Sequence, residues 1–272
     1  MFDTPATDIR IIGHRGAAAV APENTLASFR AAAALGVRWV EMDVSRLADG
    51  SAVIFHDDEL DRCSNGSGPL ARARLEEVSR LDAGSWFAPE FAGEPIPTLS
   101  AALAEIQRLG LGLNLEIKHE GPGLEALVQQ VLTTLAQEWR DPDRLLLSSF
   151  NHQALQLCQA LAPQLRRGQL YEVIPDHWQQ ELQAIAAYSL HCDYQSLTQP
   201  LAQAIKGAGY RLLCYTVNDP LAVAWHWAWG MDALFTDDPA RFLSVGGSPE
   251  SLTASQQKGT WDPSAQFCTT LR

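Results

Sequence analysis

The sequence is poor in cysteine and has no apolar run long enough to cross a membrane. Its five cysteines are odd in number, widely scattered and never arranged as C-x-x-C, which argues against a disulfide framework or a thiolate metal site. No stretch approaches the roughly 18 consecutive apolar residues of a membrane span. The opening M-F-D-T-P-A-T-D lacks the basic and apolar regions of a signal peptide. We therefore expect a cytoplasmic protein without stable membrane association.

Basic residues are also scarce. The chain has 20 lysines and arginines against 32 aspartates and glutamates, for a formal net charge of −12. Nucleic-acid binding requires a basic surface, so no nucleic-acid partner is expected. A small anionic substrate remains compatible with this charge, because a local cluster of arginine, lysine and metal can outweigh the global sign. The sequence does not predict an oligomeric state.

Several motifs of catalysis and nucleotide binding are absent as well. Neither a Walker A sequence nor G-x-G-x-x-G occurs. Ser148 and Ser149 do not lie in the G-x-S-x-G elbow of serine hydrolases. These absences argue against the usual nucleotide-binding proteins and against a serine hydrolase.

What the sequence does contain is concentrated between residues 11 and 57. This stretch alternates short, apolar, strand-like runs with charged residues and imidazoles. The polar residues at or near the ends of these runs are His14, Arg15, Glu41, Asp43 and His56. Strand ends are where α/β proteins keep their functional residues, so we expect a site here.

A hairpin is predicted at Asp49-Gly50, a dipeptide typical of a two-residue turn. Counting outward from such a turn places Asp43 opposite His56. Residues directly opposite each other in an antiparallel pair lie on one face of the sheet, and Glu41, two residues before Asp43, shares that face. This register predicts that two carboxylates and an imidazole meet.

Nine strand-like runs alternate with helical stretches along the chain. Strands are predicted at 9–12, 37–45, 52–56, 111–118, 144–150, 168–173, 191–196, 210–218 and 233–236, and helices at 26–35, 74–81, 100–109, 124–139, 153–161, 178–188, 198–208 and 220–229. The link between the second and third strands is too short for a parallel crossover, which leaves eight strands that alternate with helices. Eight β/α units predict an α/β fold, a TIM (β/α)8 barrel, as a single domain over residues 1–243. A doubly wound sheet is the alternative.

Two segments fall outside this repeat. Residues 58–98 are rich in glycine, arginine, proline and aromatics and show little core-building periodicity. We expect them to form a small insertion after the third strand-like run that caps the active-site face, with a plain surface excursion as the alternative. Residues 244–272, rich in glycine, serine, threonine and glutamine, predict a poorly ordered tail.

Three carboxylates, Glu41, Asp43 and Glu116, are predicted at neighbouring strand ends. Such a group is self-repelling unless a divalent cation neutralises it, and a set of oxygen ligands suits Mg²⁺ or Ca²⁺ better than Zn²⁺. The alternative is that each carboxylate pairs with a nearby cation such as Arg15 or Lys118.

Two histidines beside these carboxylates, His14 and His56, suit the roles of general acid and general base. Arg15 and Lys118 beside a metal would hold a phosphate group. The alternatives are hydrogen-bonded structural histidines and simple salt bridges. Together the residues predict metal-assisted phosphoryl chemistry on an ester or diester.

Several short motifs follow one another in order along the chain. They are H-R-G at 14–16, P-E-N-T at 22–25, E-M-D at 41–43, D-G at 49–50, H-D-D at 56–58, E-I-K at 116–118 and Y-T-V-N at 215–218. Together they resemble the glycerophosphodiester phosphodiesterases over residues 9–242. The phrases R-x-S-N-G, D-A-G-S-W-F and L-L-S-S-F look most like the cytoplasmic bacterial members. Tyr215 is a departure, because the family often has tryptophan there.

The resemblance implies a TIM barrel with a small insertion, a place in lipid and glycerol metabolism, and hydrolysis of deacylated phospholipids to sn-glycerol 3-phosphate and an alcohol. It assigns one divalent cation to Glu41, Asp43 and Glu116, acid–base catalysis to His14 and His56, and the phosphate to Arg15 and Lys118. It also implies that the glycerol 2-hydroxyl attacks phosphorus and that water opens the resulting cyclic phosphate. Two other functions remain open: a phospholipase-D-like lyase acting on intact lipids, and a non-catalytic phosphodiester-binding protein.

Overall fold

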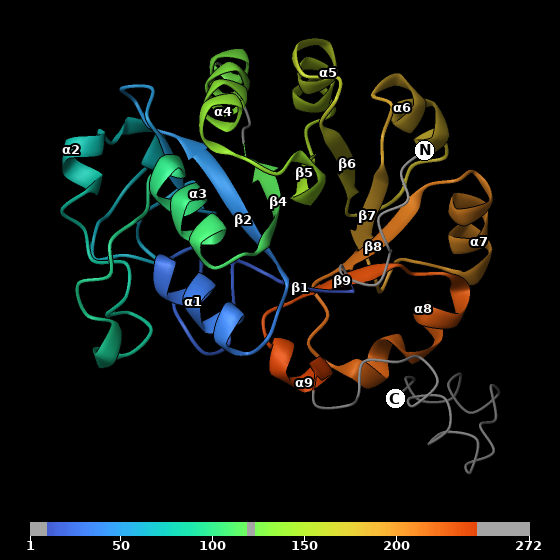
Figure 1. Cartoon of the computed structure of the whole chain (residues 1–272), viewed down its shortest axis with the longest axis horizontal. Coiled ribbons are helices and arrows are strands. Elements are labelled where there is room, and N and C mark those ends of the chain that lie inside the picture. The colour runs from blue at the N-terminus through green and yellow to red at the C-terminus, as the bar shows by residue number, and fades with distance from the viewer. Residues whose placement is uncertain (1–9, 119–122, 244–272) are drawn as a thin grey trace, which may run out of the picture.

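A closed barrel of parallel strands forms the centre of the protein (Figure 1). The computed structural model describes residues 10–118 and 123–243. The parallel strands are β1 (Ile11–Gly13), β2 (Trp39–Arg46), β4 (Gly112–Ile117), β5 (Leu145–Ser149), β6 (Arg166–Tyr171), β7 (Ser189–Asp193), β8 (Arg211–Tyr215) and β9 (Ala233–Thr236). Because β1 pairs with β2 on one side and β9 on the other, the sheet closes. This closure confirms the predicted TIM barrel and excludes an open, doubly wound sheet.

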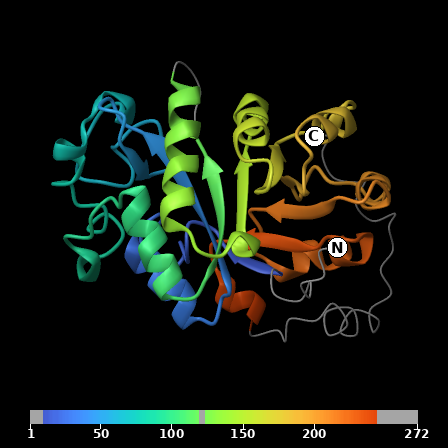
Figure 2. The ribbon, with the colours of Figure 1, turned by 45° about the horizontal axis from the view of Figure 1, so that its top comes forward.

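Helices surround the barrel (Figures 1 and 2). They are α1 (Leu26–Ala34), α3 (Leu99–Arg108), α4 (Leu124–Glu138), α5 (His152–Leu161), α6 (Trp178–Ala184), α7 (Gln199–Gly207), α8 (Ala224–Trp229) and α9 (Pro239–Leu243), with single 3₁₀ turns at η3 (Pro142–Arg144) and η4 (Pro220–Val223). Thr25, Thr98 and Asn151 begin helices by accepting hydrogen bonds from backbone N–H groups of the first turn. Among the described residues, no helix combines the length and apolar character needed to span a bilayer.

Strands β6 and β7 each begin two residues earlier than predicted. In β6 the early start includes Arg167, which is 3% exposed although a charged side chain is unusual inside a buried strand. Its guanidinium donates to the backbone carbonyl oxygens of Ile185, at 2.8 Å, and of Leu165. A buried cation is tolerated when carbonyl oxygens satisfy its donors, and an apolar pattern does not reveal such partners.

The predicted hairpin exists, but its predicted register is wrong by one residue. Strand β3 (Ala52–Ile54) pairs antiparallel with β2, and Val44 lies opposite Ile54. Asp43 therefore faces Phe55, whose N–H donates to the Asp43 carbonyl at 3.0 Å. His56 lies beyond the end of β3 and reaches the site from the following loop rather than from across the sheet.

A longer turn explains the shift. The Leu47 N–H donates to the Ser51 carbonyl at 2.9 Å, which leaves a three-residue loop. Gly50 has a φ of 89°, in the left-handed region that three-residue hairpin loops use at this position. One extra loop residue moves every predicted cross-strand pair by one, and a one-residue slip reverses the faces.

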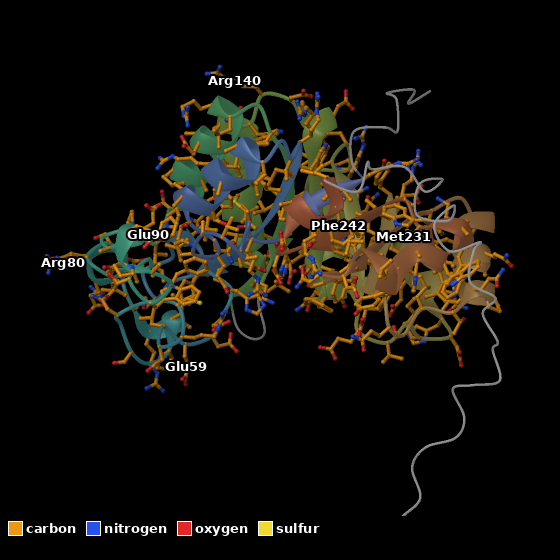
Figure 3. All side chains as sticks on the ribbon, turned by 90° about the horizontal axis from the view of Figure 1, so that it is seen from below. Glu59, Arg80, Glu90, Arg140, Met231 and Phe242 are labelled. Atoms are coloured by element: carbon orange, nitrogen blue, oxygen red, sulfur yellow. The ribbon has the colours of Figure 1, made fainter. Side chains whose placement is uncertain are left out.

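Residues 58–98 form a compact extension at one side of the barrel. Figure 3 labels Glu59, Arg80 and Glu90 within it, well away from Met231 and Phe242. Its helical turns are η1 (Leu70–Arg72), α2 (Leu75–Val78) and η2 (Pro89–Phe91). Contrary to the sequence pattern, the extension builds an apolar core together with the β2–β3 hairpin, which comprises Leu47, Val53, Phe55, Leu60, Cys63, Leu70, Val78, Ala83 and Ile96. The tail predicted at 244–272 lies outside the described residues.

Candidate active site

Glu41 and Asp43 of β2 and Glu116 of β4 converge at one point in the barrel. Parallel pairing sets Asp43 directly beside Glu116, and the two-residue alternation of β2 turns Glu41 toward the same side. One carboxylate oxygen from each of the three residues lies within 4.8 Å of the other two. All three side chains are buried, so the cluster predicted from the sequence exists.

The carboxylates repel one another strongly in this position. Burial, together with the charges of Asp43 and Glu116, raises the pKa of Glu41 well above its usual value. Burial and the Asp43 charge raise the pKa of Glu116 to about 7, although Lys118 opposes them from 3.2 Å. The Oε1 atom of Glu41 is buried without a hydrogen-bond partner. Three oxygen donors, one of them unsatisfied, fit a hard divalent cation.

Arg15 is held in place by an unusual backbone conformation. Its φ of 51° lies in the left-handed region, which is strained for a residue with a side chain. This conformation directs the Arg15 N–H to Glu41 Oε2, at 2.9 Å, and the guanidinium Nε toward Asp43 Oδ2, at 3.4 Å. The adjoining Gly16 has no room for a side chain, because a Cβ would lie 2.3 Å from Ser28 Oγ. The H-R-G motif is thus needed for the backbone conformation of this turn as well as for the chemistry of its side chains.

Asn24, of the P-E-N-T motif, holds Asp43. Its Nδ2 donates to Asp43 Oδ2 at 2.8 Å, and its Oδ1 accepts from the Asp43 N–H at 3.2 Å. Asn24 also has a positive φ, of 57°. The two left-handed residues, Arg15 and Asn24, both serve the carboxylate cluster.

His56 lies between an anion and a cation. Its Nδ1 is 2.6 Å from Asp57 Oδ1, and its Nε2 is 3.3 Å from the Lys118 ammonium. An ammonium group can only donate, so Nε2 accepts and Nδ1 carries the proton that it donates to Asp57. Burial lowers the pKa of His56, and the Arg15 and Lys118 charges act in the same direction. This environment favours a neutral ring in which Nε2 carries no proton and accepts from Lys118.

His14 follows β1 and is oriented by Asp237, a residue that the sequence reasoning missed. The His14 Nδ1 lies 2.7 Å from Asp237 Oδ1, and Asn218 Nδ2 donates to the other oxygen at 2.7 Å. Burial by itself would raise the pKa of Asp237, but these hydrogen bonds hold it below the usual value. Asp237 could have been found from its position directly after the last strand, at the same end of the barrel as His14.

Arg62 is the second residue that the sequence reasoning missed. It donates to both oxygens of Asp57, at 2.5 and 2.8 Å, and to both oxygens of Glu23, at 2.7 and 2.8 Å. Glu23 in turn accepts from Arg15 Nη1 at 2.6 Å. The hydrogen bonds from Arg62 lower the pKa of Asp57 to about 2. Arg62 therefore links the partner of His56 to the partner of Arg15.

These groups surround a cavity of about 590 Å³. On one side it is lined by His14, Arg15, His56, Glu116 and Lys118, and elsewhere by Asn114, Ile117, Ser149, Phe150, Asn151, Leu170, Glu172, Tyr215, Thr216 and Phe235. No residue of the 58–98 extension lines it, although that whole segment is described. The extension reaches the site through Arg62.

The chain matches a known protein family over most of its length. The model of the Glycerophosphoryl diester phosphodiesterase family matches residues 14–241. The chain belongs to this family. The match spans every motif from H-R-G to Y-T-V-N, so the predicted family and the predicted enzyme class are confirmed.

Relatives in the glycerophosphodiester phosphodiesterase family cover nearly the whole barrel. A glycerophosphodiester phosphodiesterase from Caldanaerobacter subterraneus is 36% identical over 236 residues, which cover 86% of this chain and 96% of the relative. A phosphodiesterase structure from Oleispira antarctica, in complex with the product sn-glycerol-3-phosphate, is 40% identical with a TM-score of 0.84, over 86% of this chain and 95% of that one. A glycerophosphodiester phosphodiesterase structure from Agrobacterium tumefaciens is 29% identical with a TM-score of 0.74, over 87% and 100% of the two chains.

Proposed function

We propose that this enzyme hydrolyses glycerophosphodiesters, the deacylated phospholipids, to sn-glycerol 3-phosphate and an alcohol in a metal-dependent reaction. The observation that carries the proposal is a cluster of three carboxylates, one of which, Glu116, lines a cavity together with two carboxylate-paired histidines and two cations. The names of the relatives and the product bound by the Oleispira protein support this substrate class.

Glu41, Asp43 and Glu116 would hold one divalent cation, Mg²⁺ or Ca²⁺. The unsatisfied, buried Oε1 of Glu41 and the all-oxygen donor set support this assignment. When bound, such a cation polarises phosphoryl oxygens and lowers the pKa of a nearby hydroxyl.

Arg15 and Lys118 would bind the phosphate group. Both cations lie at the cavity wall, and both are anchored by carboxylates, Arg15 by Glu23 and Lys118 by Glu116. Donors fixed before the substrate arrives need no rearrangement as negative charge grows on the phosphoryl oxygens. Their contribution is therefore greatest in the transition state.

We assign the base of the first step to His56 and the acid to His14. The unprotonated Nε2 of His56, which accepts from Lys118 in the structure, takes the proton of the glycerol 2-hydroxyl as that oxygen attacks phosphorus. His14, which Asp237 orients through Nδ1 at 2.7 Å, gives a proton to the departing alcohol oxygen. The product of this step is a cyclic phosphate. Water then opens the ring with the two roles exchanged, which restores both histidines and releases sn-glycerol 3-phosphate.

The experiment incubates the enzyme with glycerophosphocholine and Mg²⁺ or Ca²⁺, with and without EDTA, and measures glycerol 3-phosphate. Replacing His14 or His56 with alanine should lower turnover by about 10²- to 10⁴-fold without changing the circular dichroism spectrum. His177→Ala is the control, because His177 is 60% exposed, pairs with Glu181 and does not line the cavity. Near-wild-type activity in either of the first two variants would contradict the acid–base assignment.

The same experiment separates the alternatives. A metal-dependent enzyme loses activity in EDTA and regains it when excess cation is added. No product under any condition would favour a phosphodiester-binding protein. Activity only on intact lipid vesicles would favour a phospholipase-D-like lyase.

The extension at 58–98 would cover the active-site face. Its support is Arg62, which reaches from the extension to Glu23 and Asp57 at the edge of the site. A cytoplasmic location, from the composition and the N-terminal sequence, remains a prediction, and fractionation of cells that express the full chain would test it.

A further inference from the structure

Part of the cavity lining has no role in the proposed reaction. The catalytic and phosphate-binding groups come from β1, β2, β4 and the segment after β3. The lining also includes three residues at the ends of other strands: Phe150 directly after β5, which is next to β4, Glu172 directly after β6, and Tyr215 at the end of β8. The phosphate chemistry does not need any of these three, so the remaining room in the 590 Å³ cavity is available to another part of the substrate.

Two aromatic rings line the cavity, one of them beside Lys118. Phe150 and Tyr215 pack edge to face, with ring centroids 5.8 Å apart. The Tyr215 hydroxyl donates to the Tyr171 carbonyl at 2.8 Å, which fixes its ring. The Phe150 ring is 41% exposed, and its centroid lies 5.9 Å from the Lys118 ammonium. A group attached to a phosphate held by Lys118 would therefore meet these rings.

The charge on this side of the cavity is negative. The Glu172 side chain is exposed and makes no hydrogen bond or ion pair with any residue in the described part of the chain. Burial raises the pKa of Tyr215, and Cys192 and the carboxylates of Asp193, Glu116 and Glu172 raise it further. The Tyr215 ring thus lies in a field that attracts cations.

We propose that Phe150, Tyr215 and Glu172 form a subsite for a cationic head group, so that the enzyme prefers choline and ethanolamine diesters to neutral ones. An ammonium attracts the electron-rich faces of aromatic rings, and a carboxylate without a partner adds direct attraction. Choline and ethanolamine carry their charge a short two-carbon link from the phosphate, and inositol and glycerol head groups carry none. This inference rests on the proposed function and adds its substrate preference.

The test compares kcat/KM for glycerophosphocholine and glycerophosphoinositol in the wild type, Glu172→Gln and Phe150→Leu. The wild type should prefer the choline diester. Each variant should lower kcat/KM for that diester by about threefold to tenfold, with less than a twofold change for the inositol diester. Asp176→Asn is the matched control, since Asp176 is an exposed carboxylate of the same loop that does not line the cavity. It should leave both values unchanged.

The outcomes distinguish this inference from the reaction itself. Turnover of both diesters with a ratio that neither variant changes overturns the head-group subsite and leaves the proposed function intact. An equal loss for both diesters also overturns it, because it places Glu172 or Phe150 against the glycerol moiety that all substrates share. No turnover of either diester by the wild type overturns the proposed function.

Discussion

Arg62 offers a sharp prediction, because it acts on the site without touching the cavity. Its guanidinium bonds to both oxygens of Asp57 and both oxygens of Glu23, and these carboxylates orient His56 and Arg15. Removing a group that orients catalytic side chains costs about 10- to 100-fold in activity, or roughly 1.4–2.7 kcal/mol. We therefore expect Arg62→Ala to lower kcat/KM by one to two orders of magnitude.

The loss should come from orientation rather than from a change of charge. Arg62 is the main cause that lowers the pKa of Asp57 to about 2, and without it the value returns toward 3.8. Asp57 therefore stays ionised at neutral pH in both proteins, and the neutral part of the pH–activity profile should keep its shape. Because the Arg62 side chain is 47% exposed, its ion pairs are screened, and the free energy of unfolding should fall by only about 1 kcal/mol.

The assay is steady-state hydrolysis of glycerophosphocholine, together with thermal unfolding of each variant. Added guanidinium chloride at low concentration should restore part of the activity of Arg62→Ala, which a purely structural defect would not allow. Arg62→Lys should restore less than arginine, since an ammonium does not serve two carboxylates with paired bonds. Arg80→Ala is the control in the same extension (Figure 3), because Arg80 pairs with the exposed Glu76 and does not line the cavity. Activity of Arg62→Ala within twofold of the wild type, or an equal loss in Arg80→Ala, would refute this reasoning.

Two further predictions concern the two ends of the site. Asp237→Asn should lower kcat about 10- to 100-fold, because the amide is a weaker partner for the His14 ring than the carboxylate. Asp238→Asn, a change at the neighbouring carboxylate, is the control and should leave kcat unchanged; comparable rates in the two variants would count against the role of Asp237. Without metal, the protein should be less stable at pH 8 than at pH 5.5. The folded-state pKa of Glu116, about 7, exceeds its usual 4.5, so stability falls as pH rises between them, by up to about 3 kcal/mol. Thermal unfolding measures this effect, and added Mg²⁺ or Ca²⁺ should restore the stability lost at pH 8. Glu41→Gln should raise the stability of the metal-free protein and abolish its stabilisation by the cation. A stability that does not change with pH in the metal-free protein would contradict this prediction.

Local patterns predicted much of the site. The alternation of a β-strand sets Glu41 and Asp43 on one side, and the strand-ending motifs located His14 and Glu116 correctly. The hairpin count failed, because the third loop residue depends on the positive φ of Gly50 and not on the Asp-Gly pair alone.

The residues missed by the sequence reasoning act across long separations. Asp237 meets His14 over 223 positions, and Arg62 meets Glu23 over 39. No short sequence motif contains both residues of either pair, so sequence spacing cannot predict these contacts. Arg167 is a third case, since a buried guanidinium inside a strand becomes intelligible only when the carbonyl groups around it are seen.

The closure of the barrel has a consequence for the order of events during synthesis. His14 follows the first strand and Asp237 follows the last, and they meet only because β1 pairs with β9. A chain still emerging from the ribosome therefore carries its carboxylate cluster and both histidines before it can orient the first of them. We therefore expect full turnover to begin only when β9 pairs with β1 and the barrel closes.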